Sequence, residues 1–531
     1  MPGRHTLGPL LGALLVVAIL AFIVPPARAS GSAPASRARS NGSTLVVLSG
    51  ADAITLDPML SLDGQSPLLW RAPYESLLSY GPNLTLRPLL ASSWSVSKDG
   101  RTYVFQIRHG VTFSDGVPLD AAAVKLSIDR VRKLNQGIAY ALSNVVSVDT
   151  PDKMTVRLRL SRPFEPLASA FAGIYSPMII SPRAIAGKDL GQTYLRSHMV
   201  GTGPYLLQSY VQGQKAVFVK NPHYWRGWSG SHFDRVIVFY VHDASTERLM
   251  LDQGQGDIAL FLPDDVRNAM QHDPGVTVTD IPSLNMYYLI LPTFTGPTKS
   301  LLVRQALAYA FNYQQEIKDN LQGHARQAHG PLPSTMVGYN PRLPTYTYNP
   351  AKARALLKAA GYPHGGFTLK LIYEHGYYWK RPVAELLQSN LAALGIKLDV
   401  QELSPSTWQS TLANKATAGQ IAPIVWWPSL RTPWDYLYAM FDSAAQGTAG
   451  YNFSYYSNHQ LDRLIEQGVQ EQNPARAQQM WNQAQEILAR DVPALFLYEG
   501  NYRLPMRSDI AGFVFNGIAI ETFDFYALHR A

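Results

Sequence analysis

The chain of 531 residues contains no cysteine, which excludes disulfide bridges, thiolate metal sites, cysteine nucleophiles and lipid attachment to cysteine. Charged residues are scarce, at 16% against the ~25% usual in soluble proteins. Ser, Thr, Asn, Gln and Tyr must therefore supply much of the polar surface. Hydrophobic residues make up 46%, which excludes global disorder and suffices for a large core. At ~100–200 residues per domain, the length suggests about three domains.

Common catalytic motifs and nucleic-acid signals are also missing. The sequence has no G-x-S-x-G elbow, no H-E-x-x-H pair and no Walker A loop. Residues 254–259 match the dinucleotide pattern G-x-G-x-x-A, but a predicted helix (245–252) precedes it and a predicted strand (258–262) follows, the reverse of the required order. The net charge of +8 includes four arginines before residue 44, and the rest has no dense Lys/Arg run, which argues against nucleic-acid binding.

The N-terminal segment is typical of an export signal. A weakly basic start is followed by an apolar run over residues 10–24 and by Ala27-Arg28-Ala29, a small-residue cleavage pattern. We expect a signal peptide at 1–29; the alternative is an uncleaved anchor, although the run is shorter than the ~20 residues that span a bilayer. Residues 30–43 are rich in Ser, Ala, Gly and Arg and predict a flexible tether. The protein is expected outside the cell or in the cell envelope, and not as a cysteine-anchored lipoprotein.

The remaining chain alternates between helix and strand signals and predicts an α/β fold. Asn349 followed by proline predicts a helix start, and Gly361 predicts its end. A strand is expected at 368–373, a helix at 382–394 and a further strand at 396–400. A helical crossover between two strands implies that they are parallel, in a parallel or mixed sheet. The apolar stripes of helices 303–312 and 474–490, the latter capped by Asn473, predict core packing.

Aromatic residues are abundant, with 29 Tyr and 10 Trp, and several lie in clusters. Trp426 and Trp427 follow an apolar run, 421–425, that predicts a buried strand. Ligands of open α/β sheets bind beyond the carboxyl ends of strands, so these residues are candidate ligand contacts, with core packing as the alternative. Further candidate contacts in the aromatic clusters are Trp434, Tyr288 and Tyr377. No metal ligands are expected, because His324 and His329 have a poor spacing for one helix face.

Several sequence blocks, in order, resemble a known family. They are LDP (56–58), LASSW (90–94), DG (99–100) with Phe105, Arg108, Val111, Phe113 and DG (115–116), VGTGPY (200–205), NPHYW (221–225), GQGD (254–257) and VRQAL (303–307). Together they are similar to the extracellular solute-binding proteins, family 5, of bacterial ABC importers, the oligopeptide-, dipeptide- and nickel-binding type. Gly201 and Gly203 beside Pro204 also suit a sharp turn.

This resemblance implies a type II periplasmic-binding-protein fold, in which two lobes close over a ligand cleft and an extra domain is inserted in the first lobe. The implied boundaries are 44–76 with 201–284 and 491–531 for lobe I, 77–200 for the inserted domain and 285–490 for lobe II. The implied function is a monomeric, non-enzymatic protein that captures a peptide or peptide-like solute and delivers it to a membrane permease. No catalytic residue, cofactor or metal is expected.

The loop after the tryptophans bears on specificity. Peptide-binding members place an aspartate there to pair with the ligand's α-ammonium, and the resemblance puts Ser429 at or near that position. A hydroxyl cannot supply the same charge-assisted bond. Arg431 would attract a carboxylate, and Asp435 is a substitute acid if the loop is shifted. The alternatives left open are an oligosaccharide, an anionic metabolite or a metal chelate as ligand, and a secreted hydrolase that pairs Glu374 with Asp435.

Overall fold

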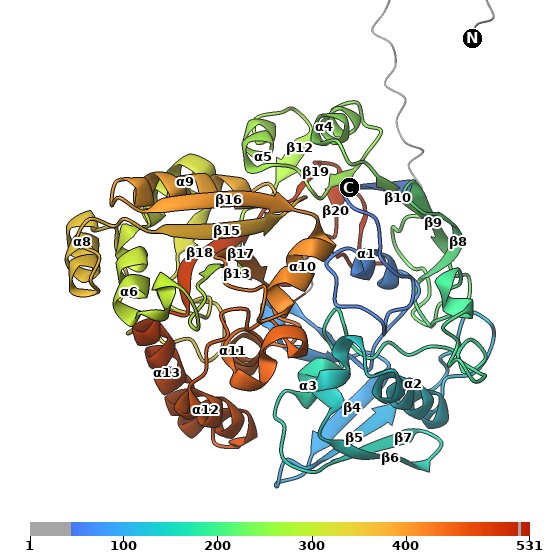
Figure 1. The fold of residues 1–531 in the computed structure, drawn as a ribbon. Helices are drawn as coiled ribbons and strands as arrows, with labels where there is room; N and C mark the ends of the chain where they lie inside the picture. Colours follow the sequence, from blue (N-terminus) through green and yellow to red (C-terminus); the bar gives the residue numbers. More distant parts are fainter. Residues whose placement is uncertain (1–43, 519–521) are drawn as a thin grey trace, which may run out of the picture. The chain divides into compact units, whose positions relative to one another are not determined.

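The computed structural model describes residues 44–518 and 522–531, shown as a ribbon in Figure 1. The predicted signal peptide (1–29) and tether (30–43) lie outside the described residues. Within those residues, no helix combines the length and apolar character that crossing a membrane requires. The strands of this part of the chain form sheets of seven, four and four strands and three two-stranded pairs.

The seven-stranded sheet has strands from distant parts of the chain. Its order is β12 (Val276–Val278), β19 (Pro505–Arg507), β11 (Ile258–Ala259), β1 (Thr44–Ser49), β10 (Arg235–Tyr240), β9 (Lys215–Lys220) and β8 (Tyr205–Val211). The central strand β1 is parallel to β10 and β11, and it is buried on both faces, as its continuous apolar run predicts. Helices α1 (Ser66–Trp70), α4 (Ala244–Asp252) and α5 (Asp264–Met270) lie in the segments 44–76 and 201–284, which also supply most strands of this sheet.

An antiparallel sheet fills the region predicted as the inserted domain. Its order is β4 (Ala91–Val96), β5 (Thr102–Ile107), β7 (Thr155–Leu160) and β6 (Val145–Asp152), with α2 (Ala121–Leu134) packed against β6 and β7 (Figure 1). The pair β2 (Leu78–Tyr80) and β3 (Leu86–Pro88) and the short helix α3 (Leu167–Ala170) lie in the same region.

The second four-stranded sheet is antiparallel and adjoins a parallel pair. Its order is β14 (Ala325–Gln327), β18 (Ala494–Tyr502), β13 (Ile281–Ile290) and β17 (Ala422–Trp426). The parallel pair is β15 (Thr368–Glu374) and β16 (Lys397–Leu403), and α9 (Lys380–Ala392) connects them. The remaining elements are α6 (Leu301–Ala310), α7 (Tyr313–Gln315), α8 (Pro350–Ala359), α10 (Pro405–Ala413), α11 (Pro433–Phe441), α12 (His459–Gln470), α13 (Pro474–Asp491), β20 (Ile510–Ala511) and β21 (His529–Arg530).

The helix ends confirm the local sequence signals. The Asn349 side chain accepts a hydrogen bond from the Lys352 N–H at the start of α8, and the Asn473 side chain does the same for the first turn of α13. Gly361 and Gly395 follow α8 and α9 with φ of 90° and 73°, a conformation that glycine adopts without strain. The strand–helix–strand unit β15–α9–β16 is parallel, as expected.

The predicted domain boundaries stay a prediction, and two strands bear on them. The boundary at 284/285 falls within β13. Strand β18 belongs to the segment assigned to lobe I, yet it pairs with β13 and β14 rather than with the seven-stranded sheet. The chain passes between the seven-stranded and this four-stranded sheet from β12 to β13 and from β18 to β19.

The sequence blocks that carry the family resemblance form buried polar contacts. Glu75 accepts hydrogen bonds from Thr202, Tyr224 and Trp225, at 2.7–2.9 Å. Gly201 has no positive φ, so the expected turn is not the reason for glycine there. Instead, a Cβ atom at this position would lie 2.1 Å from a main-chain carbonyl oxygen, so glycine permits a close approach of two backbone segments.

Asp57 of the LDP block has a similar structural role. Its carboxylate forms a two-point ion pair with Arg130 of α2, with 2.9 Å between Arg130 Nη1 and Asp57 Oδ1. Both side chains are buried, and Arg130 also donates to the Leu190 carbonyl oxygen. The pair therefore attaches the helix of the predicted inserted domain to the N-terminal segment of the body.

Candidate functional site

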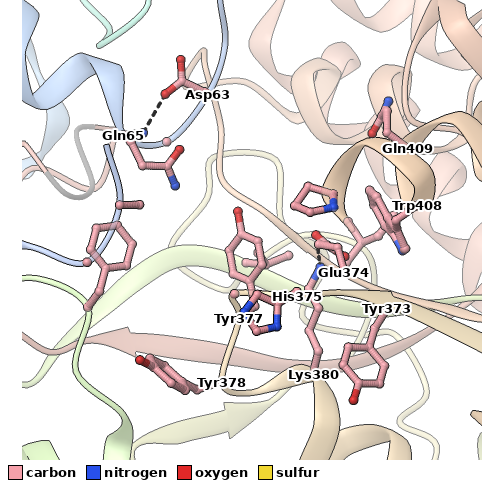
Figure 2. Close-up of a pocket in the computed structure, with 18 of the residues that line it drawn as sticks. Asp63, Gln65, Tyr373, Glu374, His375, Tyr377, Tyr378, Lys380, Trp408 and Gln409 are labelled. Carbon is pink, nitrogen blue, oxygen red and sulfur yellow. Dashed lines mark hydrogen bonds and ion pairs between the residues drawn. The ribbon is translucent and has the colours of Figure 1, made fainter. Parts of the chain in front are cut away.

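The main cavity has a volume of about 1080 Å³ and is lined by distant segments of the chain. One wall comes from the N-terminal segment 50–65, with Tyr175 beside it. The other comes from the segments 373–381, 402–409 and 424–429. Figure 2 shows Asp63 and Gln65 on the first wall and Glu374, Tyr377, Lys380 and Trp408 on the second. Pockets of about 300–1,000 Å³ accommodate small molecules, so this cavity can enclose a solute of that size or slightly larger.

Two neighbouring strands explain why residues about 50 positions apart meet in this cavity. Strand β17 is antiparallel to β13, but on its other side Ile421 forms a parallel bridge with Leu371 of β15. The carboxyl ends of β15 and β17 therefore lie at the same edge. Glu374 is the last residue of β15 and Trp426 the last residue of β17, and the segments that begin there, 374–378 and 426–429, both line the cavity.

Four of the eight predicted site residues line the cavity: Trp426, Trp427, Ser429 and Tyr377. The Trp426 ring packs edge-on against Tyr451, with 5.2 Å between ring centroids. The Trp427 indole N–H donates a hydrogen bond to the Tyr175 hydroxyl at 3.0 Å, which connects the loop after β17 to the other wall. Their role in ligand binding stays a prediction, and their position in the structure is consistent with it.

Tyr288 is placed away from the cavity. Its side chain is fully buried and its hydroxyl donates to the Pro331 carbonyl oxygen at 2.6 Å. Tyr287, its neighbour on β13, instead lines an adjoining cavity of about 140 Å³. Successive side chains of a strand point to opposite faces, and the Tyr-Tyr pair alone did not show which face holds the ligand.

Trp434 and Arg431 also lie outside the main cavity. Trp434 is stacked between Tyr140 and Tyr438, with centroid distances of 5.9 and 4.8 Å, which is core packing. Arg431 donates through Nη1 to the Leu84 carbonyl oxygen at 3.0 Å. It therefore faces the predicted inserted domain, and the expected attraction of a ligand carboxylate has no support from this position.

Asp435 organises the loop after β17 instead of lining the cavity. It is 2% exposed; Oδ2 accepts from the Ser429 N–H at 2.9 Å, and Oδ1 accepts from the Tyr140 hydroxyl at 3.1 Å. Burial raises the pKa of this carboxyl to about 7, although the Ser429 N–H and the Tyr140 hydroxyl oppose the rise. Ser429, expected near the position of a ligand-binding aspartate, is thus held through its main chain by the acid six residues later.

A buried ion pair between Glu374 and Lys380 was missed as a site feature. Lys380 Nζ contacts Glu374 Oε1, and the two residues are 2% and 8% exposed. The lysine also lies over the rings of Tyr377 and Trp408, at 4.6 and 5.0 Å from the ring centroids. Burial lowers the pKa of Lys380 to about 8, partly opposed by Glu374. The sequence signal that could have indicated this pair was Glu374 at the end of a predicted strand, followed by Lys380 near the start of the next predicted helix.

The described residues offer no metal-binding cluster. Nowhere in 44–518 and 522–531 do three or more His, Asp or Glu side chains gather in a way that could hold a metal ion. His324, considered as a metal ligand from the sequence, contacts Asp280 at 2.7 Å, whereas His375 contacts Glu402 at 2.6 Å in the main cavity. These contacts are pairs, not coordination sets.

Comparison with known proteins decides the family. Residues 85–448 match "Bacterial extracellular solute-binding proteins, family 5 Middle". The chain belongs to this family. Over 509 residues, it is 31% identical to a probable D,D-dipeptide-binding periplasmic protein of Escherichia coli, covering 94% of this chain and 96% of the relative. A glutathione-binding protein of Pectobacterium atrosepticum is 29% identical over 459 residues, with 85% and 88% covered.

Solved structures confirm the predicted type II periplasmic-binding-protein fold with its extra domain. An ABC transporter-associated periplasmic binding protein of Helicobacter pylori in complex with the peptide STSA has a TM-score of 0.81 at 24% identity, covering 92% of this chain and 98% of that one. A Campylobacter jejuni protein in complex with Ni(L-His) has the same TM-score at 21% identity, with 92% and 100% covered. The family consists of solute-binding proteins, and this chain is a solute-binding component of an ABC importer.

Proposed function

We propose that this protein captures a peptide or peptide-like solute in the main cavity outside the cell and delivers it, chemically unchanged, to a membrane permease. The observation that carries the proposal is the cavity of about 1080 Å³ between the segment 50–65 and the carboxyl ends of β15 and β17. Aromatic side chains, Trp408, Trp426 and Trp427 among them, provide apolar walls for such a solute. The relatives named for dipeptide and glutathione binding support a peptide-like ligand.

The cavity has walls from both predicted lobes, which supports capture by lobe movement. Ligand binding to such a protein stabilises the closed state, since the ligand contacts both walls only when they approach each other. The hydrogen bond from Trp427 to Tyr175 joins the two walls of the cavity directly. The direction of transport and delivery to a membrane permease are parts of the proposal.

Two alternatives lose the residues on which they depended. An anionic metabolite was considered because of Arg431, which binds the Leu84 carbonyl oxygen instead of lining the cavity. A hydrolase was considered because of Glu374 and Asp435. Asp435 lies behind Ser429, and Glu374 is paired with Lys380, so the two carboxylates do not face a common substrate position in the cavity. An oligosaccharide stays possible on chemical grounds, since aromatic rings also stack on sugars.

A titration tests the proposal. Intrinsic tryptophan fluorescence should change when members of a di- and tripeptide library bind, because three tryptophans line the cavity. We expect dissociation constants in the micromolar range or below for at least one peptide, and mass spectrometry should recover that peptide intact. Folded protein that ignores every peptide but binds sugars would reassign the ligand. Recovery of cleaved peptide would contradict the non-enzymatic part.

A further inference from the structure

The main cavity carries an excess of acidic side chains. Its described lining contains two cations and four carboxylates: Lys380 and Arg381, and Asp52, Asp63, Glu374 and Glu402. Both cations already have partners, since Lys380 contacts Glu374 and Arg381 donates to Glu385 at 2.8 Å. An incoming anion would therefore meet no free cation in this lining and would be repelled by the surplus carboxylates.

The four carboxylates differ in how well their oxygens are satisfied. Asp52 accepts hydrogen bonds at both oxygens, from a tyrosine hydroxyl and from a main-chain N–H. Glu402 also uses both oxygens, toward His375 and Tyr373. Each oxygen of these two carboxylates therefore already has a donor.

Glu374 has the strongest unmet demand for a donor. It is 92% buried, and its Oε1 contacts Lys380, while Oε2 has no hydrogen-bond partner among the described residues. A buried carboxylate oxygen without a donor is unfavourable, so such an oxygen at a binding cavity indicates a missing partner. Asp63 also keeps Oδ2 unpartnered within the described part of the chain, but that side chain is only partly buried.

Aromatic rings beside Glu374 already face the amine nitrogen of Lys380. The rings of Tyr377, Trp379 and Trp408 lie 4.6–5.4 Å from Lys380 Nζ, within the range of cation–π attraction. Tyr377 and Trp408 also line the cavity (Figure 2). A second cation that approaches Glu374 from the cavity would therefore meet the same aromatic faces.

We propose that Glu374 recognises a protonated amine of the solute, which donates a hydrogen bond to its Oε2 atom. The inference rests on the proposed function for the location of the ligand and narrows the ligand to solutes with an ammonium group. It assigns the charge recognition to the end of β15 and not to the loop after Trp427. That loop offers Ser429, whose main chain is bound to the buried Asp435.

The test compares pairs of probes in which one member has an ammonium group and the other does not. Calorimetric titrations use alanyl-phenylalanine against its N-acetylated form, and 2-phenylethylamine against 2-phenylethanol, which have no peptide bond. The full chain is compared with Glu374→Gln and with Glu486→Gln, an exposed carboxylate on α13 outside the cavity. Because Glu374→Gln leaves Lys380 buried without a counter-charge, the double variant Glu374→Gln with Lys380→Met is included in case the single variant fails to fold.

A charge-assisted hydrogen bond at a buried site predicts that the wild-type protein binds the charged probe of a pair about ten- to a hundredfold more tightly. This preference should fall to less than about threefold in Glu374→Gln or in the double variant, and Glu486→Gln should retain it. Retention of the preference without Glu374 overturns the inference and leaves the proposed function intact. If only the amine pair is discriminated, the inference stands and the peptide proposal fails. If the wild-type protein binds no probe of either pair at millimolar concentration, both fail.

Discussion

The raised pKa of Asp435 leads to a prediction with an unusual sign: replacing this buried acid with asparagine should stabilise the protein at alkaline pH. In Asp435→Asn, the amide oxygen can still accept from the Ser429 N–H, and the amide nitrogen can donate to the Tyr140 oxygen once that hydroxyl rotates. The shape of the side chain is nearly unchanged, so packing should be conserved. What the substitution removes is the cost of ionising a carboxyl in a buried site.

The magnitude follows from the shift. Burial raises the pKa of Asp435 from 3.8 to about 7. Between these values the folded protein binds more protons than the unfolded chain, so stability decreases as the pH rises through this window. At 1.36 kcal/mol per pKa unit, the total cost above pH 7 is about 4 kcal/mol. Asp435→Asn should therefore gain up to ~4 kcal/mol relative to wild type between pH 4 and pH 8.

Urea denaturation followed by tryptophan fluorescence at pH 4, 6 and 8 measures this difference. As a control, Asp99→Asn removes an exposed carboxyl whose pKa is lowered from 3.8 by a hydrogen bond from Ser97. Its linkage to pH lies at and below that value, so the effect of this substitution should stay nearly constant from pH 4 to pH 8. The reasoning is refuted if Asp435→Asn destabilises the protein equally at all three pH values, because the carboxylate would then contribute favourable bonds that outweigh its burial.

Three further predictions concern contacts described above. Lys380→Met leaves Glu374 without its counter-charge and should lower the free energy of unfolding by about 3–5 kcal/mol. Adding Glu374→Gln should largely reverse this loss. Calorimetry or urea denaturation measures both variants, and losses that simply add would contradict the pairing. Gly201→Ala should cost about 1–3 kcal/mol in the same assay, because its Cβ would lie 2.1 Å from a carbonyl oxygen, and a neutral result would show that the backbone segments can separate. Trp427→Phe keeps an aromatic ring but loses the hydrogen bond to Tyr175, so the free energy of unfolding should fall by about 1 kcal/mol. Its ligand affinity should fall less than that of Trp427→Ala. Equal affinities for the two variants would count against a ligand contact by the ring.

Local signals in the sequence were sufficient to predict much of the fold. Asn349 and Asn473 cap the helices that they were expected to cap, and Gly361 and Gly395 follow helices with positive φ. These features depend on interactions within a few residues, which one sequence can show. The parallel pair β15–β16 follows from them, because a helix of this length connects two strands only as a crossover.

The candidate site depended more on non-local pairing. Trp426 and Tyr377 share the cavity because β17 lies next to β15, a contact between segments that no local pattern specifies. Trp434 follows the tryptophan pair by only seven residues, yet it lies in α11 and faces the core. Asp435, at the start of α11, holds the loop between them through the Ser429 N–H.

The contacts around Glu75 have a consequence for how such proteins are recognised. Thr202, Tyr224 and Trp225 come from two of the blocks by which the family was identified, and they meet on one carboxylate that lies outside the main cavity. In this chain the contacts of those two blocks hold the fold together and do not touch the solute cavity. Substitutions confined to the cavity lining would leave them in place, so the same two blocks are compatible with different transported solutes.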